Sequence, residues 1–569
     1  MGFLVPLIAP GLVGTVGGSL LSGAVSLGAS FGLSFLARKL EPRGRVEASE
    51  TAREIGAQIN LQVDPNVSRK IIFGTAATAG SLVYWHLSGA DNERLEMVIA
   101  LADHECEAVS RVFVDGQQVT IAGNGDVASY NNNLNIRFAL GTASQAADAA
   151  LIANSGGRWT SSEQGLNVCY AIVTMTYTEE DFPSGVPSFL FEVQGAKLYD
   201  PRKDTTAGGS GAHRFNDPST WEWSDNAAVA IYHFLRGYGV NGQLLTGLNA
   251  PEEAVRFAEA SAAMNACDEL VALKAGGSEK RYRIGAVVDT ARTNKEILAD
   301  MLQAMAGEVI ESGGIYRMFA GVAQTPVITV TDDDVIVGEP FEITPKRSRS
   351  DLVNAVFGSF SDPAAQYQAV ALPPRTSSAD ETADGGVRYP TTIDLKYVTS
   401  RTQAQRIQEI TRKRARRPLI AKCTLRAGMS VIEPGDWITF NSTRRGWVSK
   451  VFQVETVTVN RNSTVEVLLR ENDAGFDDWT AATDELDDNQ VVDLAPGGPP
   501  LDTLQGLSIA NVTIASSGGV QRPGLRATWT PVNDKTVVRI EFEYRAVGTS
   551  DVFSVRALDP SAGSYTWVS

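Results

Sequence analysis

The sequence predicts a multidomain protein that is mainly β with an α+β part. With 569 residues the chain is too long for one hydrophobic core, and we expect about three to five domains. Many short runs rich in Val, Ile and Thr alternate apolar and polar residues, which is typical of half-buried strands. The 52 Gly residues and frequent turn signals separate these runs and favour strands over long helices.

Residues 1–40 form an apolar, Gly-rich N-terminal segment. No Asp, Glu, Lys or Arg precedes Arg38, and the run is long enough to cross a bilayer. It lacks the positively charged start of a signal peptide. Small residues recur four apart and allow helices to pack closely, at Gly14, Gly18, Gly28 and Gly32. Three interpretations stay open: a transmembrane anchor, a segment buried inside an assembly, and a disordered apolar tail.

The next part of the chain predicts a strand-built module. Residues 41–56 are polar and read as a connector. Alternating runs with turns between them then extend over residues 57–200, which is typical of a meander or a small barrel. A polar, turn-rich stretch near residues 125–165 looks like an insertion into this module.

Residues 201–319 predict a helical and α+β domain. We expect helices at residues 226–236 and 251–267, joined by a Gly-rich turn. A third helix begins after Thr293 or Asn294, either of which can cap it, and an apolar stripe follows at helical spacing.

Strands return in residues 320–498 and predict a second module. A helix interrupts it from Ser400 to about Arg416 and ends before Pro418, because the residue before a proline is disfavoured in a helix. A Pro- and Gly-rich linker closes this module.

Residues 499–569 resemble the opening strands of a fibronectin type III sandwich. Trp529 and Tyr544 are the aromatic residues expected in its core. Because such a sandwich needs about seven strands and fewer fit before Ser569, we expect only a partial domain and a longer natural protein.

Composition and cysteine spacing limit the chemistry. The formal net charge of −16 argues against a general nucleic-acid binder, because such proteins neutralise phosphates with Lys and Arg. His104 and Cys106 lie two apart in a strand pattern and point the same way, but no second pair lies nearby. We interpret the cysteines as buried, reduced thiols and expect no metal and no cofactor: Cys106, Cys169, Cys267 and Cys423.

The stretch from residue 198 to residue 237 concentrates charged residues, Gly, Trp and His. Catalysis there would need a nucleophile or paired carboxylates with fixed partners, and the spacing identifies none. We therefore interpret the stretch as a structural joint. Ser224 or Asp225 is expected to cap the following helix, and two Trp residues on one face are expected to cover its start. The joint residues are Trp221, Trp223, Ser224, Asp225 and Asn226.

Two charged clusters each allow two interpretations. A basic cluster lies near a helix C-terminus, where the helix dipole favours positive charge, and reads as a solvated or ion-paired helix end. Its members are Arg412, Lys413, Arg414, Arg416 and Arg417. The acidic run Asp332–Asp334 reads as a turn or helix start, with cation binding as the alternative, since the pattern of an EF-hand loop is incomplete. No common catalytic motif occurs where a fold would support it, so we expect no enzyme activity.

Several segments resemble the central tail hub proteins of lambda-type siphophages, the tail-tip host-specificity family. The most specific is "FNDPSTWEWSDNAAVAIYHFLRGYGV", which follows "KLYDPRKDTT"; "VIALADHECEAVSRVFVDGQQV", "LVNAVFGSFSDPAAQYQ" and "VIEPGDWITF" add to it. Together the segments cover most of residues 60–475. A fibronectin-like domain after the hub is also a feature of this family.

The resemblance implies a homotrimeric hub at the distal end of the tail. Residues 57–200 and 320–498 would be two tail-tube-like β-barrel modules, residues 201–319 their link, and residues 499–569 would project toward receptor-binding parts. Ring closure would make the interface heterologous. Implied partners are distal tail and tail-tube-type proteins, the tape-measure protein, a bacterial cell-surface receptor reached through distal parts, and DNA in transit.

The implied functions are closing the tail tube, host attachment and DNA ejection. The alternative interpretation of the basic cluster is contact with DNA that passes through the tail lumen. Residues 1–37 depart from the pattern of this family, and our hypothesis is that three copies of them meet in the lumen and later engage the host membrane. The alternative hypothesis is a membrane-anchored multidomain surface adhesin.

Overall fold

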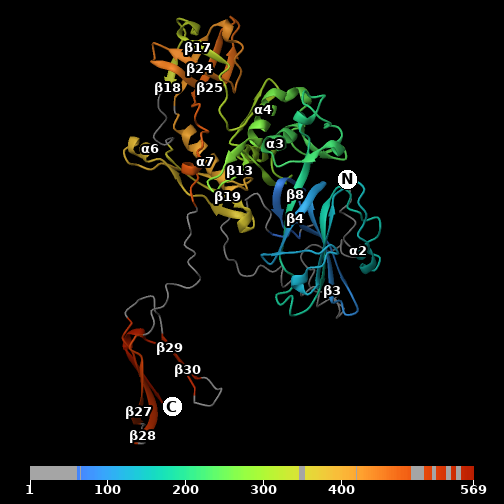
Figure 1. The fold of residues 1–569 in the computed structure, drawn as a ribbon, viewed down its shortest axis with the longest axis vertical. Coiled ribbons are helices and arrows are strands. Elements are labelled where there is room, and N and C mark those ends of the chain that lie inside the picture. Colours follow the sequence, from blue (N-terminus) through green and yellow to red (C-terminus); the bar gives the residue numbers. More distant parts are fainter. Residues whose placement is uncertain are drawn as a thin grey trace. The chain divides into compact units, whose positions relative to one another are not determined.

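The computed structural model describes residues 60–63, 66–344, 353–417, 419–487, 505–515, 519, 521–532, 540–545 and 553–568. Strands predominate in it (Figure 1). The chain divides into two compact units, of which the first ends at Asp487 and the second begins at Asp488. The predicted apolar segment with Gly14, Gly18, Gly28 and Gly32 and the connector at 41–56 lie outside the described residues. Every helix within the described ranges is too short or too polar to span a membrane.

Two antiparallel sheets form the N-terminal part of the first unit. The larger has the order β14-β1-β8-β4-β5, with the short β9 added to β8. Its strands are β1 (Lys70–Thr78), β4 (Cys106–Val114), β5 (Gln117–Val119), β8 (Phe189–Leu198), β9 (Glu222–Trp223) and β14 (Gly285–Asp289). The smaller has the order β2-β3-β7-β6: β2 (Ser81–Ser88), β3 (Arg94–Ala102), β6 (Leu134–Leu140) and β7 (Cys169–Thr176).

Strand β1 is buried on both faces, and this explains its nearly continuous apolar sequence. Ile72 points into the core shared with the smaller sheet, whereas Ile71 and Phe73 point into the core of the helical part. The alternation of side chains along one strand therefore joins two hydrophobic cores.

The stretch near residues 125–165 is only partly an insertion. Strand β6 pairs with β7 from Leu134 to Leu140 and is integral to the smaller sheet. Helix α2 (Ala149–Asn154) follows, and Leu151 and Trp159 pack on the outer face of that sheet.

The helical part has one extensive core. It collects residues from α3 (Ala227–Arg236), α4 (Phe257–Asp268), α5 (Asn294–Gln303) and α7 (Arg401–Ala415), together with β1, β8 and β14. Three hairpins lie in this region: β10 (Tyr238–Val240) with β11 (Gln243–Thr246), β12 (Leu270–Ala272) with β13 (Ser278–Lys280), and β15 (Glu308–Ser312) with β16 (Ile315–Phe319).

A four-stranded sheet contributes to the same core. It contains β19 (Ala355–Asp362), β20 (Gln368–Ala371), β21 (Arg375–Thr376) and β22 (Pro390–Leu395), and it contributes Phe360 and Leu395 to this core. Helix α6 (Ser378–Ala383) connects β21 to β22. The core thus crosses the predicted boundaries at 200/201 and 319/320, and those boundaries stay predictions.

A six-stranded sheet completes the first unit. Its order is β17-β24-β25-β26-β23-β18: β17 (Ile328–Thr331), β18 (Glu342–Thr344), β23 (Ile420–Leu425), β24 (Trp437–Ser442), β25 (Trp447–Val459) and β26 (Val465–Glu471). A separate core that includes Phe440, Phe452 and Leu469 lies on one face. The short helix α8 (Ala481–Asp484) follows.

The described strands form open sheets, so the prediction of two β-barrels was wrong in this respect. In the second module β17 joins β24 in parallel and β18 joins β23, and these two strands end the sheet as separate edges. In the first module the strands divide between two sheets that enclose a core.

The second unit contains two small antiparallel sheets. One comprises β27 (Ser508–Ala515), β28 (Gln521–Thr528) and β31 (Ser564–Val568), and the other β29 (Ile540–Tyr544) and β30 (Phe553–Leu558). Trp529 and Trp567 are buried with Phe542 beside them, which confirms Trp529 as a core aromatic. Tyr544 lies in β29, and its side chain is outside the described residues.

Candidate functional site

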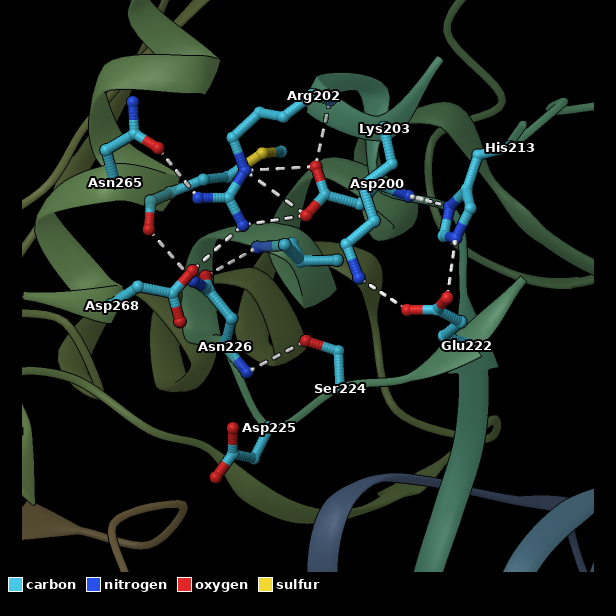
Figure 2. A network of polar contacts seen from close by, with 12 residues as sticks. Asp200, Arg202, Lys203, His213, Glu222, Ser224, Asp225, Asn226, Asn265 and Asp268 are labelled. Carbon is cyan, nitrogen blue, oxygen red and sulfur yellow. Dashed lines mark hydrogen bonds and ion pairs between the residues drawn. The ribbon is translucent and has the colours of Figure 1, made fainter. Parts of the chain in front are cut away.

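The predicted joint lies where β8 leaves the first sheets and the chain enters the helical part. Asp200 starts a single helical turn, because its carboxylate accepts a hydrogen bond of 2.9 Å from the backbone nitrogen of Arg202. The Arg202 guanidinium also donates to both Asp200 oxygens, from Nε to Oδ1 and from Nη2 to Oδ2. It then reaches α4, where it donates to Asn265 (2.8 Å) and Asp268 (2.9 Å), as Figure 2 shows. One arginine thus joins the end of β8 to a helix.

Asp268 is the second centre of this network. Its other oxygen lies 3.2 Å from Lys280 Nζ, which also contacts Asp225 at 3.0 Å. Burial acts to raise the pKa of Asp268, but hydrogen bonds from Arg202 and Asn226 and the charge of Lys280 outweigh burial and hold that pKa below its usual range. Asp268 is therefore an ionised structural partner of two cations.

Asn226 caps helix α3, and the prediction that Ser224 or Asp225 would do so was wrong. The Asn226 side chain accepts from Val229 N (3.1 Å) and donates to the Met264 carbonyl (2.9 Å). The helix begins only at Ala227, so the two earlier residues lie too far from the free N–H groups of its first turn. Ser224 instead accepts from Asn226 N.

The two joint tryptophans contact different elements and do not share the start of α3. The Trp221 ring meets His233, in the second half of α3, with centroids 4.6 Å apart, and its indole N–H donates to the Arg214 carbonyl. The Trp223 indole donates to the carbonyl of Gly74 in β1. Trp221 ends a helical turn, so the period of two assumed for a strand does not hold between them.

The sequence predicted helix α7 but not the role of its glutamines. Its glutamines are fully buried and bond to the backbone of neighbouring segments. Gln403 accepts from Arg283 N (3.0 Å) and donates to the carbonyls of Arg283 (2.8 Å) and Ala304 (2.7 Å). Gln405 exchanges hydrogen bonds of 2.8 and 2.9 Å with the backbone of Leu486. The sequence did contain a signal for this. Polar residues lie on every side of the predicted helix, so some of them must face the core.

A buried ion pair strengthens the same helix. Arg406 is 2% exposed, and its guanidinium contacts Glu279 at 2.9 Å and the Arg281 carbonyl at 2.9 Å. Glu279 also accepts from Ser400, the residue that caps α7. Burial acts to raise the pKa of Glu279, but Arg406 and the two hydroxyl donors Thr402 and Ser400 lower it on balance.

The five basic residues after Glu409 all have partners within the chain. Arg412 pairs with Glu409 and Asp380, Arg416 with Asp384, and Arg417 with Asp473. Lys413 donates to the carbonyls of Gly475 and Asp478. The Arg414 guanidinium donates to the carbonyl of Ala306 and lies over the ring of Phe476. The cluster is thus ion-paired at the helix end, and contact with DNA stays a prediction.

The acidic run and the cysteines have structural surroundings. Asp332–Asp334 forms a helical turn, which confirms the prediction of a turn or helix start; Asp332 accepts from Ser442 (2.7 Å) and pairs with Arg445 (3.0 Å). All four cysteines are free and buried, as expected. Across the described ranges, no group of three or more His, Cys, Asp or Glu residues is placed to hold a metal ion.

Comparisons with known proteins point to phage tails. Residues 293–454 match the family described as putative phage tail protein. No curated protein matches the chain. Among solved structures, a chain of a native gene transfer agent virion is 19% identical, over 80% of this chain and 98% of that one, with a TM-score of 0.49.

Two tail proteins are more distant. The 43 kDa tail protein of prophage MuSo2 from Shewanella oneidensis is 9% identical over 73% of this chain and 99% of its own, with a TM-score of 0.27. The prophage tail protein gp18 from Listeria monocytogenes EGD-e is 12% identical over 71% and 95%, with a TM-score of 0.24. Likenesses with TM-scores below 0.5 are too loose to assign an architecture. The family match shows that residues 293–454 are similar to a putative phage tail protein.

Proposed function

We propose that the chain is a structural virion protein that forms the trimeric central hub at the distal end of a siphophage tail. The observation that carries the proposal is the family match at residues 293–454. That segment extends from α5 through α7 into β25, so it contains both the buried polar helix and much of the six-stranded sheet. The hub closes the tail tube and takes part in host attachment and DNA ejection.

The internal chemistry favours a structural role over catalysis. At the joint, Asp200, Arg202, Asp268 and Lys280 neutralise one another. A catalytic carboxylate or base would instead need to be held close to a space for substrate. We infer that these groups fix the angle between elements and that the chain is not an enzyme.

The open sheets supply surfaces for assembly. Strands β17 and β18 are the edges of the six-stranded sheet, and edge strands present backbone groups that pair with or pack against another chain. In a threefold ring such contacts are heterologous and close on themselves. The two strand-built modules then face tail-tube-type proteins and the tape-measure protein, and DNA passes between them.

The second unit carries the distal parts in this proposal. Its two antiparallel sheets around Trp529 are the beginning of a fibronectin type III domain, through which the hub reaches a bacterial receptor. Residues 1–37 line the lumen and later engage the host membrane. Flotation of a peptide of residues 1–39 with liposomes tests the membrane step, and a peptide that stays in the aqueous fraction rules it out.

Native mass spectrometry of the purified chain, alone and mixed with tail-tube rings, tests the hub. A trimer that binds the rings is the expected result. A monomer that pellets with membranes and ignores the rings would support the surface adhesin and refute the hub. Deletion of the gene should abolish infectious particles, and complete, infectious particles without the protein would have the same refuting force.

A further inference from the structure

Histidine is rare in this chain and concentrated in one place. The sequence contains four histidines, and three of them are buried around the junction of β1, β8 and α3, with exposed fractions of 0 to 4%. Each accepts a hydrogen bond from a backbone N–H: His104 Nε2 from Ile72 (2.9 Å), His233 Nδ1 from Tyr199 (3.2 Å) and His213 Nδ1 from Asp200 (3.2 Å).

The three amides lie in or directly after two paired strands. Ile72 lies within β1, and Tyr199 and Asp200 directly follow β8. These are the strands that pass from the core of the first sheets into the core of the helical part. His233 lies on α3 and His213 in the segment that follows β8, whereas His104 lies in the connection between β3 and β4. The bonds of His233 and His213 therefore hold the end of β8 against the helical part, and the bond of His104 holds β1 to the connection between β3 and β4.

Aromatic contacts link the three rings into one cluster. Tyr238 lies between His104 and His233, with ring centroids 5.6 and 5.2 Å away. His233 also meets Trp221. On the other side, Tyr199 contacts the ring of His213. A change at one ring is thus transmitted to its neighbours by direct packing.

An imidazole nitrogen accepts a hydrogen bond only while it carries no proton. Protonation places a hydrogen on the accepting nitrogen, so the two N–H groups then oppose each other. The buried charge also loses its hydration. Each protonation therefore removes one hydrogen bond that fixes β1 or the end of β8 at the junction.

The groups around each ring set how readily it takes a proton. Burial lowers the pKa of His104 to about 4, although its N–H donates to the Glu105 carbonyl at 2.7 Å and the Glu105 carboxylate is near. Cys106 also lies beside this ring. Burial, with the charge of Arg236, lowers the pKa of His233 to about 3.

His213 has more charged neighbours. Burial lowers its pKa, and the charge of Lys203 acts in the same direction. The carboxylates of Glu222, Asp200 and Asp204 oppose both, and Glu222 Oε1 lies 3.9 Å from His213 Nε2. We expect His213 to be the first of the three to take a proton.

We propose that this histidine cluster is an acid-sensitive release, whose protonation loosens β1 and the end of β8 where they meet the helical part and lets the first sheets move. The direction follows from linkage. The unfolded histidines have pKa values near 6.5, above those in the folded joint, so the joint is fully stable above about pH 6.5 and loses stability as the pH falls toward about 4. The inference does not depend on a role in a tail.

Hydrogen exchange of the full chain, corrected for the intrinsic pH dependence of exchange, tests the release. Between pH 7 and pH 4.5, protection in peptides covering residues 70–78 and 196–203 should fall by about tenfold or more, the signature of a local opening. Peptides covering residues 447–471 in the six-stranded sheet should keep theirs. Unchanged protection at the joint, or an equal loss in both regions, would overturn the proposal.

Amide variants provide the matched comparison. H104Q places an amide oxygen near the position of Nε2, and H213N and H233N place one near Nδ1, so the triple variant keeps the acceptors but cannot titrate near neutral pH. It should retain protection at pH 4.5. H86N, at the fourth histidine and outside the joint, should behave like the natural chain. A triple variant that opens as the natural chain does would refute the mechanism.

A second measurement applies if the triple variant fails to fold. Proton uptake by the histidine rings of the natural chain is then followed by NMR of the ring Cε1–H groups across the same pH range. Uptake by buried histidines that coincides with the loss of protection supports the release. Opening without uptake, or uptake without opening, contradicts it.

Discussion

The buried glutamines of α7 allow a test of what holds the helical part together. Gln403 and Gln408 lie on the same helix and are both 0% exposed. Gln403 makes three short hydrogen bonds to backbone groups, at 2.7 to 3.0 Å. Gln408 makes two long ones, at 3.3 and 3.5 Å, and its carbonyl oxygen is without a partner. Replacement of each by Met nearly conserves side-chain length and removes only the polar contacts.

The expected costs differ because the lost contacts differ. At about 1 kcal/mol for each well-formed hydrogen bond, Q403M should destabilise the first unit by about 3 kcal/mol. Q408M should cost less than about 1 kcal/mol, since its contacts are near the limit of hydrogen bonding. Differential scanning calorimetry of the full chain compares the two, and Q403M should lower the Tm by a few degrees more than Q408M. Equal shifts, or a larger shift for Q408M, would show that burial alone decides the cost.

Three further substitutions test other contacts. Replacement of Asp436 by Ala leaves the buried guanidinium of Arg317 without its 2.8 Å partner and should destabilise the first unit by about 2 to 4 kcal/mol; calorimetry measures this, and an unchanged Tm would contradict it. Tyr367→Phe removes the 2.7 Å hydrogen bond to Glu192 and should cost about 1 to 2 kcal/mol, with faster hydrogen exchange at both segments as the readout. Trp529→Ala removes a buried ring from the core of the second unit and should lower the free energy of unfolding of that unit by about 3 to 5 kcal/mol. Limited proteolysis should then cleave only after residue 487. Cleavage within the first unit would contradict the independence of the two units.

Local signals in the sequence located α5 and α7 well, whereas the helix predicted from residue 251 begins only at Phe257. Thr293 and Glu296 form a capping box at the start of α5. Thr293 was one of the two residues predicted to cap this helix. Helix α7 begins after Ser400 and ends at Ala415, close to the predicted bounds, because Ser is a good N-cap and Pro418 prevents continuation. These features depend on residues within one helical turn.

The pairing of strands that lie far apart in the chain could not be predicted from the sequence. Strand β1 pairs with β14, and Lys70 faces Asp289 across the ladder. Strand β17 runs parallel to β24. Alternation indicates that a segment is a strand but does not say which strand lies beside it, so open sheets and closed barrels predict the same pattern.

The prediction of the residue that caps α3 was wrong for a related reason. Ser224, Asp225 and Asn226 are all good caps by residue type, and only the tertiary contacts choose among them. Lys280 takes the Asp225 carboxylate, while the Met264 carbonyl fixes the Asn226 amide. Both partners lie far along the chain, so propensity could not separate the candidates.

The last residues of the first unit are held by the same helix that organises its core. Gln405 holds Leu486 through both backbone groups, and Arg375 donates to the Asp484 carbonyl at 2.7 Å. The end of the first unit is therefore tied to α7. On the same helix, Gln403 bonds to the backbone of Arg283, which lies just before β14. Since β14 pairs with β1, a continuous series of hydrogen bonds runs from the exit of the first unit to the strand that joins its two cores.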